Sequence, residues 1–209
     1  MSIHRSILHN LPMEIHYINI LNLLEAITSM DKLHLGQISI FWGDGKGKTT
    51  AALGTALRAT GNGYTAHLVQ CMKNGAGDPE IELPGELKAL SQLSSFSMKR
   101  FGAGEWIIGK PNKEAIVSFQ EALAYLRTCF GKYDILIADE FLYAIQLGLC
   151  TEAEIAQVIK DKPIHQELIL TGSHKPYPTL FELADLVTEI KKVKHPYDKG
   201  VLARKGIEY

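Results

Sequence analysis

The sequence predicts a single α/β domain in which a parallel β-sheet is flanked by helices. Short apolar segments alternate with segments of helical periodicity, which is the pattern of strands joined by right-handed crossover helices. A glycine-rich loop joins the first of these strands to the first of these helices. The chain has 209 residues, 46% hydrophobic and 22% charged, which suits one globular domain with a substantial core.

Residues 36–50 read Gly-Gln-Ile-Ser-Ile-Phe-Trp-Gly-Asp-Gly-Lys-Gly-Lys-Thr-Thr, which predicts a strand, a phosphate loop and the start of a helix. Glycines let successive backbone N–H groups converge on one point, and the helix N-terminus adds partial positive charge, so a polyphosphate fits there. We expect Lys48 to contact phosphate oxygens, Thr49 to ligate Mg²⁺ and Lys46 to add a second cation. The expected nucleotide-binding residues of the loop are Gly43, Asp44, Gly45, Lys46, Gly47, Lys48, Thr49 and Thr50.

The loop departs from the Walker A pattern at its beginning. That pattern has a glycine, four residues and then Gly-Lys-Ser/Thr, and Trp42 stands where the first glycine belongs. Counted from Gly43, the loop is one residue short. The sequence therefore predicts phosphate binding more firmly than it predicts ordinary ATP hydrolysis. The expected fold class is phosphate-loop NTPase-like (RecA-like).

Composition excludes several classes of partner. The net charge is −1, from 22 basic and 23 acidic residues, so no global field favours nucleic acid or an anionic membrane. No apolar run is long enough to span a bilayer, and we find no signal-peptide pattern at the N-terminus. The scattered cysteines Cys71, Cys129 and Cys150 fit free, buried thiols in a reducing compartment, so a cytoplasmic protein is expected.

Two regions are predicted: an N-terminal extension over residues 1–35 and a phosphate-loop domain over residues 36–209. In the extension, Tyr17, Ile20, Leu24 and Ile27 recur at helical spacing, which predicts an amphipathic helix over residues 13–30. Such a helix packs on its own domain or on a partner.

After the loop, the pattern predicts a helix over residues 49–60 and a strand over residues 64–70. Residues 71–111 are rich in Gly, Ser, Lys and Pro and predict a long functional loop region with extended pieces such as residues 96–101. Asn112 is expected to cap a helix over residues 113–130.

The second half continues the alternation. An apolar strand over residues 133–138 runs directly into Asp139-Glu140. Thr151-Glu152-Ala153-Glu154 is a capping box, and we expect its helix to end near residue 161. A strand over residues 166–171, a helix from Pro178 and a last strand over residues 186–190 complete the prediction.

The polar residues that follow these strands converge on one crevice, because ligands collect at the carboxyl edge of an open parallel sheet. Gln70, Asp139, Glu140 and Thr171 all fall there, together with the glycine loop. Asp139 matches a Walker B acid, which holds Mg²⁺ directly or through water. Glu140 either polarises an attacking water, as in a hydrolase, or serves the metal or the substrate.

Several ordered motifs resemble one known family. They are Gly43-Asp-Gly-Lys-Gly-Lys-Thr-Thr-Ala-Ala, Val69-Gln70, Asp139-Glu140, Leu170-Thr171-Gly172, Ala184-Asp185-Leu186-Val187-Thr188-Glu189, and Val193-Lys194-His195 with Gly200 and Gly206-Ile207-Glu208-Tyr209. Together they are similar to the ATP:corrinoid adenosyltransferases of the cobalamin pathway. The resemblance covers roughly residues 36–209.

The resemblance implies transfer of the 5′-deoxyadenosyl group of ATP to the Co(I) of a corrinoid, with release of triphosphate. It implies ATP and the corrinoid as substrates and Mg²⁺ as cofactor. The implied metal ligands are Thr49, Asp139 and Glu140, and the implied catalytic residues are Lys48, Lys46 and Glu140, acting by positioning and by electrostatic stabilisation of the triphosphate. ATP lies reversed in this family, and the shortened loop fits that orientation.

The corrinoid side of the site departs from the family pattern. The family places bulky apolar side chains after a Gly-x-Gly, and here that stretch carries Glu105, so Phe101 and Trp106 are the candidates for the corrin face. Ser173 stands where the family commonly has an arginine, and His174 or Lys175 are the candidates to replace its charge.

Two other classes remain open at this stage. The loop and the acid pair also fit an ATPase or kinase that yields ADP, and the departures at Glu105 and Ser173 fit a nucleotide- or corrinoid-binding protein without turnover. The family resemblance further implies a flavoprotein or similar reductase that supplies the electron for Co(I), and a homodimer.

Overall fold

The computed structural model describes residues 34–73, 83–102, 107 and 109–208. The chain divides into two compact units, Met1–Leu35 and Gly36–Tyr209, and the second unit carries every element described below. The helix expected over residues 13–30 and the corrin candidate Trp106 lie outside the described residues. Within the described parts of the chain, no helix combines the length and the apolar character that crossing a membrane requires.

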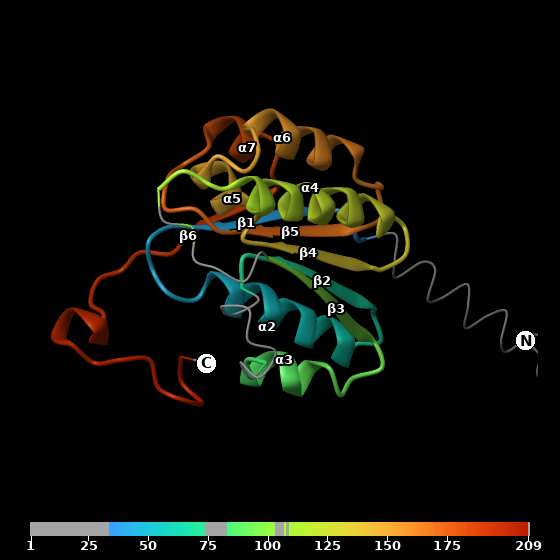
Figure 1. The fold of residues 1–209 in the computed structure, drawn as a ribbon. Helices are drawn as coiled ribbons and strands as arrows, with labels where there is room; N and C mark the ends of the chain where they lie inside the picture. The colour runs from blue at the N-terminus through green and yellow to red at the C-terminus, as the bar shows by residue number, and fades with distance from the viewer. Residues whose placement is uncertain (1–33, 74–82, 103–106, 108, 209) are drawn as a thin grey trace, which may run out of the picture. The chain divides into compact units, whose positions relative to one another are not determined.

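In the described part of the chain, six parallel strands form one sheet in the order β3-β2-β4-β5-β1-β6 (Figure 1). Their bounds are β1 Ile38–Trp42, β2 Ala66–Cys71, β3 Phe96–Phe101, β4 Ile135–Asp139, β5 Glu167–Thr171 and β6 Leu186–Glu189. Strands β2, β4 and β5 are buried along almost their whole length, which explains their near-continuous apolar sequences. The predicted fold class, a parallel α/β sheet of the phosphate-loop type, is confirmed.

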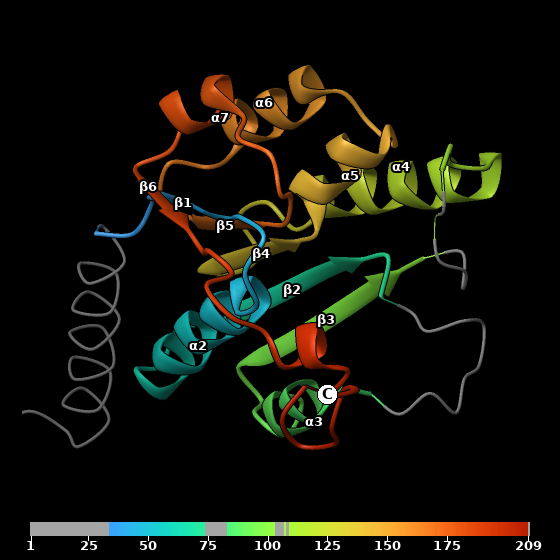
Figure 2. The same cartoon turned by 90° about the vertical axis from the view of Figure 1, so that its left-hand side faces the viewer.

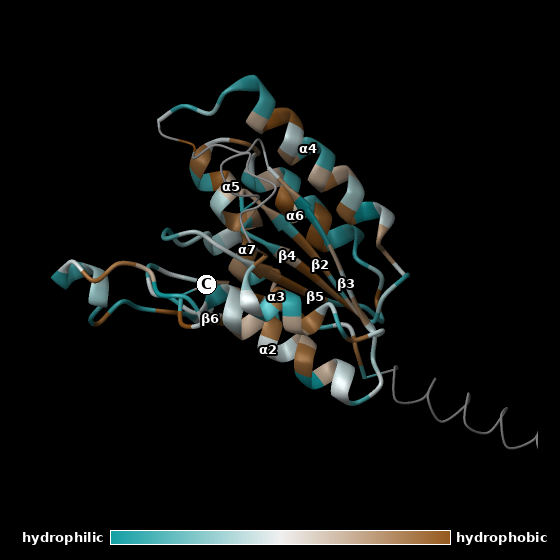
Figure 3. Cartoon of the chain, turned by 60° about the horizontal axis from the view of Figure 1, so that its bottom comes forward, coloured by the Kyte–Doolittle hydropathy of each residue, from teal (hydrophilic) through white to brown (hydrophobic). Residues whose placement is uncertain are grey.

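Helices cover both faces of the sheet (Figures 1 and 2). One face carries α2 (Lys48–Gly61) and α3 (Gly85–Leu90), and the other carries α4 (Lys113–Thr128), α5 (Phe141–Leu147), α6 (Glu152–Asp161) and α7 (Pro178–Glu182). The hydrophobic residues concentrate along the central strands and on the helix faces that meet them (Figure 3). A 3₁₀ turn at Pro196–Lys199 lies in the C-terminal tail.

The predicted helix caps are present. The Asn112 side chain accepts a hydrogen bond from the Ala115 amide at 2.8 Å and begins α4. Thr151 and Glu154 bond to each other's backbone amides and form a complete capping box at α6. These residues satisfy amide groups that a helix N-terminus otherwise leaves without partners.

The expectation of a long loop region over residues 71–111 missed one helix, whereas its extended piece at residues 96–101 is present. Helix α3 forms within this region, and residues 96–101 form a full strand of the sheet, paired with β2 from Ala66↔Phe96 to Cys71↔Phe101. Composition did not indicate this helix because it has six residues, of which only Leu87 and Leu90 are buried. Both pack against residues that are distant in the sequence, so no local periodicity marks the helix. Helix α5 also escaped the sequence analysis, since no capping side chain marks its start.

All three cysteines are free and buried, as expected. Burial raises the pKa of the Cys150 thiol to about 12, and it raises the pKa of Cys71 well above its usual value, with the charges of nearby carboxylates adding to the effect. The thiols of Cys71 and Cys150 therefore stay protonated at neutral pH and act as small apolar side chains.

Candidate active site

The carboxyl ends of β1, β2, β4 and β5 bring the predicted polar residues together at one edge of the sheet. Register pairs Gln70 with Asp139 across β2 and β4, and pairs Phe41 with Thr171 across β1 and β5. The glycine loop leaves the same edge from β1 and leads into α2. The crevice expected from strand order is therefore formed by residues that are far apart in sequence.

Asp139 is the centre of this group, and its carboxylate is fully buried. The hydroxyl of Thr171 donates to Oδ1 at 2.6 Å, and the hydroxyl of Thr49 donates to the same oxygen at 2.8 Å. The side-chain amide of Gln70 donates to Oδ2 at 2.9 Å. Three neutral donors thus fix the carboxylate in one orientation, beside the first residues of the phosphate loop helix.

Lys73 is a member of the site that the sequence analysis missed. Its ammonium lies 2.8 Å from Thr49 Oγ1, 2.8 Å from Glu140 Oε1 and 3.3 Å from Asp139 Oδ2. Burial acts to lower the pKa of Lys73, but the two carboxylates outweigh it and raise that pKa above its ordinary value. Lys73 lies just after a strand, at the start of a polar segment. Nothing in the sequence distinguishes it there from a solvent-exposed lysine.

Arg100 on β3 is a second residue that the sequence analysis missed. Its Nε donates to Gln70 Oε1 at 2.9 Å, which leaves the Gln70 amide nitrogen to face Asp139. Arg100 is therefore a positioning residue for Gln70. The prediction failed here because residues 96–101 were not expected to pair with β2.

The first half of the glycine loop is held against the chain that follows β6. The Gly43 amide donates to the Ser173 carbonyl at 3.0 Å, and the Gly45 amide donates to the Ile190 carbonyl at 2.7 Å. A Cβ on Gly45 would stand 2.7 Å from the Ile190 carbonyl oxygen, and one on Gly43 would stand closer still. Glycine is required at both positions because the backbone of the segment directly after β6 occupies the space of a side chain.

Gly47 and Lys48 form the second half of the loop, and Asp44 lies in its first half. Gly47 has φ +123° and precedes α2 without a capping side chain, so the first amides of this helix are not bonded to a cap. The Lys48 ammonium folds back on the loop and donates to the carbonyls of Gly43 at 2.6 Å and Gly45 at 2.9 Å. Burial lowers the pKa of Lys48. Asp44 Oδ1 accepts a hydrogen bond from the Lys192 amide at 3.0 Å, which lowers the pKa of Asp44.

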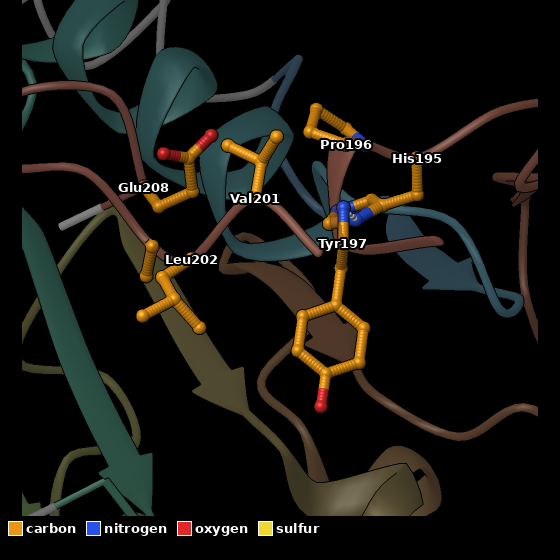
Figure 4. Close-up of a pocket in the computed structure, with 7 residues that line it drawn as sticks. His195, Pro196, Tyr197, Val201, Leu202 and Glu208 are labelled. Carbon is orange, nitrogen blue, oxygen red and sulfur yellow. Dashed lines mark hydrogen bonds between the residues drawn. The ribbon is translucent and has the colours of Figure 1, made fainter. Parts of the chain in front are cut away.

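Lys46 points to the C-terminal tail and not to the acid pair. Its ammonium donates to the Ile207 carbonyl at 3.2 Å and lies 3.4 Å from Glu208 Oε1. Arg204 also donates hydrogen bonds to Glu208 from its side chain and from its backbone amide. These bonds lower the pKa of Glu208 to about 2, and the side-chain bonds have the larger effect. The tail residues that line a small, mainly apolar pocket beside this contact are drawn in Figure 4.

Glu140 begins α5 in a left-handed conformation with φ +67°. Its amide donates to the Thr171 hydroxyl at 3.0 Å, and its carboxylate pairs with Lys73. Gly172 makes this turn possible, because a Cβ there would stand 2.7 Å from the Tyr143 amide nitrogen and 3.2 Å from the Glu140 Cα. Glu140 therefore faces the same cation as Asp139.

The corrin candidate Phe101 ends β3, half-buried. Its ring centre lies 5.6 Å from that of Tyr125, and the Lys99 ammonium stands 5.1 Å from the Phe101 ring. Ser173, where an arginine was expected from the family, is fully buried with φ +62°, and its hydroxyl lies 3.2 Å from Gln146 Oε1 and 2.8 Å from the Lys175 carbonyl. Ser173 thus secures the turn that holds Gly43.

The donor set suits a magnesium–nucleotide complex. Thr49, Asp139 and Glu140 offer hard oxygen atoms, and one or two carboxylates together with substrate phosphates are the usual protein environment of Mg²⁺. The Lys73 ammonium already lies among these oxygens, so the geometry accepts a cation there. Within the described residues, no group of three or more His, Cys, Asp or Glu gathers that could hold a metal by itself.

Residues 34–209 match the family model of the ATP:corrinoid adenosyltransferases BtuR/CobO/CobP. The chain belongs to this family. It is 32% identical to the corrinoid adenosyltransferase of Escherichia coli (strain K12) over 179 residues, which cover 83% of this chain and 86% of the relative. It is also 32% identical to the corrinoid adenosyltransferase CobA of Salmonella typhimurium, with the same coverage.

A third relative is the corrinoid adenosyltransferase of Pseudomonas aeruginosa, which is 27% identical and covers 83% of this chain and 84% of its own length. The region matched by the family model, residues 34–209, contains the glycine loop, the acid pair and the C-terminal tail. The resemblance drawn from the sequence motifs is confirmed at the level of the family, and with it the assignment of the chain as an enzyme of this type.

Proposed function

We propose that this adenosyltransferase moves the 5′-deoxyadenosyl group of ATP to the Co(I) of a corrinoid and releases triphosphate, in adenosylcobalamin synthesis or salvage. Family membership supports the reaction class. The single structural observation that carries the proposal is the contact between the Thr49 hydroxyl and the buried Asp139 carboxylate at 2.8 Å, directly after a glycine loop. This contact joins the phosphate-binding and metal-binding parts of one site.

The residues of the loop bind and orient the triphosphate that becomes the leaving group. The first amides of α2 and the Lys48 ammonium supply positive charge, and Lys46 supplies more once it leaves Glu208. When bound by Thr49, Asp139 and Glu140, Mg²⁺ neutralises further charge on the triphosphate. Because the Co(I) of the substrate is the nucleophile, the protein acts mainly by positioning and by electrostatic stabilisation.

The acid pair supports transfer over hydrolysis. A hydrolase needs a carboxylate that polarises water, whereas the Glu140 carboxylate is paired with Lys73 at 2.8 Å and is held in a left-handed turn. We therefore assign the Glu140 carboxylate to binding the cation of the site. The reaction expected of this arrangement is attack at the ribose 5′ carbon, for which no water has to be activated.

On the corrinoid side, we assign Phe101 and Trp106 to the corrin face. Phe101 supports this because its aromatic cluster lies at the carboxyl end of β3, next to the strand that carries Gln70. A flavoprotein or similar reductase that generates Co(I), a homodimer and a cytoplasmic location complete the proposal. Truncation of residues 1–30 tests whether the helix predicted there contributes to the dimer interface. An unchanged oligomeric state in solution would show that it does not.

The reaction is tested by ³¹P NMR of the products. The protein is incubated with Mg-ATP and chemically reduced cobalamin under anaerobic conditions in dim light. Triphosphate that forms only with the corrinoid is the expected result, and ADP and phosphate without corrinoid dependence would replace the proposal with an ATPase. Lys48→Ala is expected to abolish triphosphate release while circular dichroism stays unchanged, because the Lys48 ammonium donates its hydrogen bonds to carbonyls of the loop and Lys48 belongs to no hydrophobic core cluster of the described residues.

A further inference from the structure

Lys73 occupies the place in the site where the three proposed metal ligands converge. Its ammonium touches Thr49, Asp139 and Glu140 at 2.8, 3.3 and 2.8 Å. Among the described residues, the Asp139 carboxylate bonds to Thr49, Gln70, Thr171 and Lys73, and of these four only Lys73 carries positive charge. A buried carboxylate is costly without a compensating charge, so this ammonium stabilises the site.

The backbone aims Lys73 at the acid pair. Met72, directly after β2, has φ +60°, a conformation that non-glycine residues seldom adopt. The Met72 amide donates to the Phe101 carbonyl at 2.9 Å, which ties this turn to the end of β3. This hydrogen bond and the left-handed conformation of Met72 direct the next side chain toward the acid pair.

The ammonium and a magnesium ion cannot share these oxygens. Mg²⁺ requires oxygen ligands at about 2.1 Å, so it would lie among the same three atoms and at close range to a like charge. The Lys73 side chain is 36% exposed, whereas that of Asp139 is not exposed at all. The lysine stem is long and flexible, and it can carry its charge out into water while the carboxylate stays in place.

From this geometry, and resting on the metal site of the proposed function, we propose that Lys73 is a resident counter-ion of the acid pair that a divalent cation has to displace. The ammonium holds Thr49, Asp139 and Glu140 in their binding arrangement before nucleotide arrives. A free divalent cation then binds weakly, because part of its binding free energy is spent on removing the ammonium. Mg²⁺ binds well only when the phosphates of ATP supply further ligands.

The test measures Mn²⁺ binding to the full chain by electron paramagnetic resonance without nucleotide. Lys73→Met keeps a flexible stem of similar length and removes the charge. We expect Lys73→Met to bind Mn²⁺ at least tenfold more tightly than the wild type. Lys191→Met is the matched control, because the Lys191 ammonium is exposed and pairs with Glu189 at 3.1 Å, and its Mn²⁺ affinity should equal that of the wild type. Equal or weaker binding by Lys73→Met would overturn the proposal.

A second measurement uses the wild type and does not depend on the stability of the variant. The ¹⁵N resonance of the Lys73 ammonium, assigned with Lys73→Arg, is expected to be visible without metal and to shift or broaden when Mg²⁺ is added. An unchanged resonance at saturating Mg²⁺ would refute displacement. Failure of the proposed function has a different signature, since it shows as absent triphosphate release while Lys73→Met still binds Mn²⁺ more tightly.

Discussion

Gly45→Ala is the substitution that most directly tests how the shape of the phosphate loop determines ATP affinity. The added Cβ would stand 2.7 Å from the Ile190 carbonyl oxygen and 2.8 Å from the Lys191 carbonyl carbon, about 0.7 Å short of the 3.4 Å at which ordinary contacts begin. Both neighbours are backbone atoms, so no side chain can rotate away. The loop has to move off the segment after β6.

The expected cost has two parts. Overpacking at a closed position costs roughly 1–3 kcal/mol, and loss of the 2.7 Å hydrogen bond from the Gly45 amide to Ile190 costs about 1 kcal/mol. When the loop relieves the clash by moving, it has to return to its binding shape for Mg-ATP to bind, and most of this free-energy cost then falls on binding. Mg-ATP affinity is expected to fall by roughly 10- to 100-fold, since about 1.4 kcal/mol corresponds to a factor of ten. The two parts together lower the free energy of unfolding by about 2–4 kcal/mol.

Isothermal titration calorimetry gives the affinity and urea denaturation gives the stability. Gly54→Ala in α2 is the matched control, because its Cβ would meet no atom within 4 Å in an exposed part of the helix. It should keep wild-type affinity and gain about 0.5–1 kcal/mol of stability from lower backbone entropy in the unfolded chain. Wild-type affinity and stability in Gly45→Ala would refute the contact argument, and lost stability with wild-type affinity would refute the role of this loop in ATP binding.

Three further predictions concern the acid centre, a buried histidine and a helix cap. Asp139→Asn should lower the rate of triphosphate release by about 100-fold or more, measured by single-turnover ³¹P NMR, because it removes a proposed metal ligand; a rate within threefold of wild type would contradict it. Burial lowers the pKa of His67 to about 4, so the folded state favours the neutral ring. The free energy of unfolding should therefore be highest above pH ~6.5 and should fall by up to about 3 kcal/mol as the pH falls toward about 4. Urea titrations at pH 7.5 and 4.5 should show that His67→Phe removes this difference, and an equal pH dependence in both proteins would rule it out. Thr151→Ala, which loses the bonds to Glu154, should lower the free energy of unfolding by about 1 kcal/mol, and no change in urea midpoint would show that the cap is dispensable.

Sequence reasoning located most of the acid centre for a topological reason. The glycine loop and the acid pair each follow an apolar run, and the carboxyl ends of parallel strands meet at one edge whatever the order of the strands. The contacts of Asp139 with Thr49, Gln70 and Thr171 are the result. The prediction needed only local pattern and the handedness of crossovers.

The partners of the charged side chains were beyond the reach of the same reasoning. The sequence places Lys46 and Lys48 together in the loop, yet Lys46 turns to Ile207 and Glu208 in the tail while Lys48 folds back on Gly43 and Gly45. A lysine stem reaches in many directions, and the nearest carboxylate or carbonyl decides which one is taken. Local sequence does not encode that choice.

The sequence by itself determined the fold class, the family and the strand–loop–helix unit that begins the domain, because each depends on short-range pattern or on ordered motifs. The tertiary structure alone decided that residues 96–101 join the sheet, that Arg100 orients Gln70 and that Lys73 completes the acid centre. Arg100 and Gln70 are 30 residues apart and Lys73 and Asp139 are 66 apart, so only the folded sheet brings them within bonding distance. Contacts of this kind depend on strand register and on one turn at Met72, and neither leaves a periodic signal in the chain.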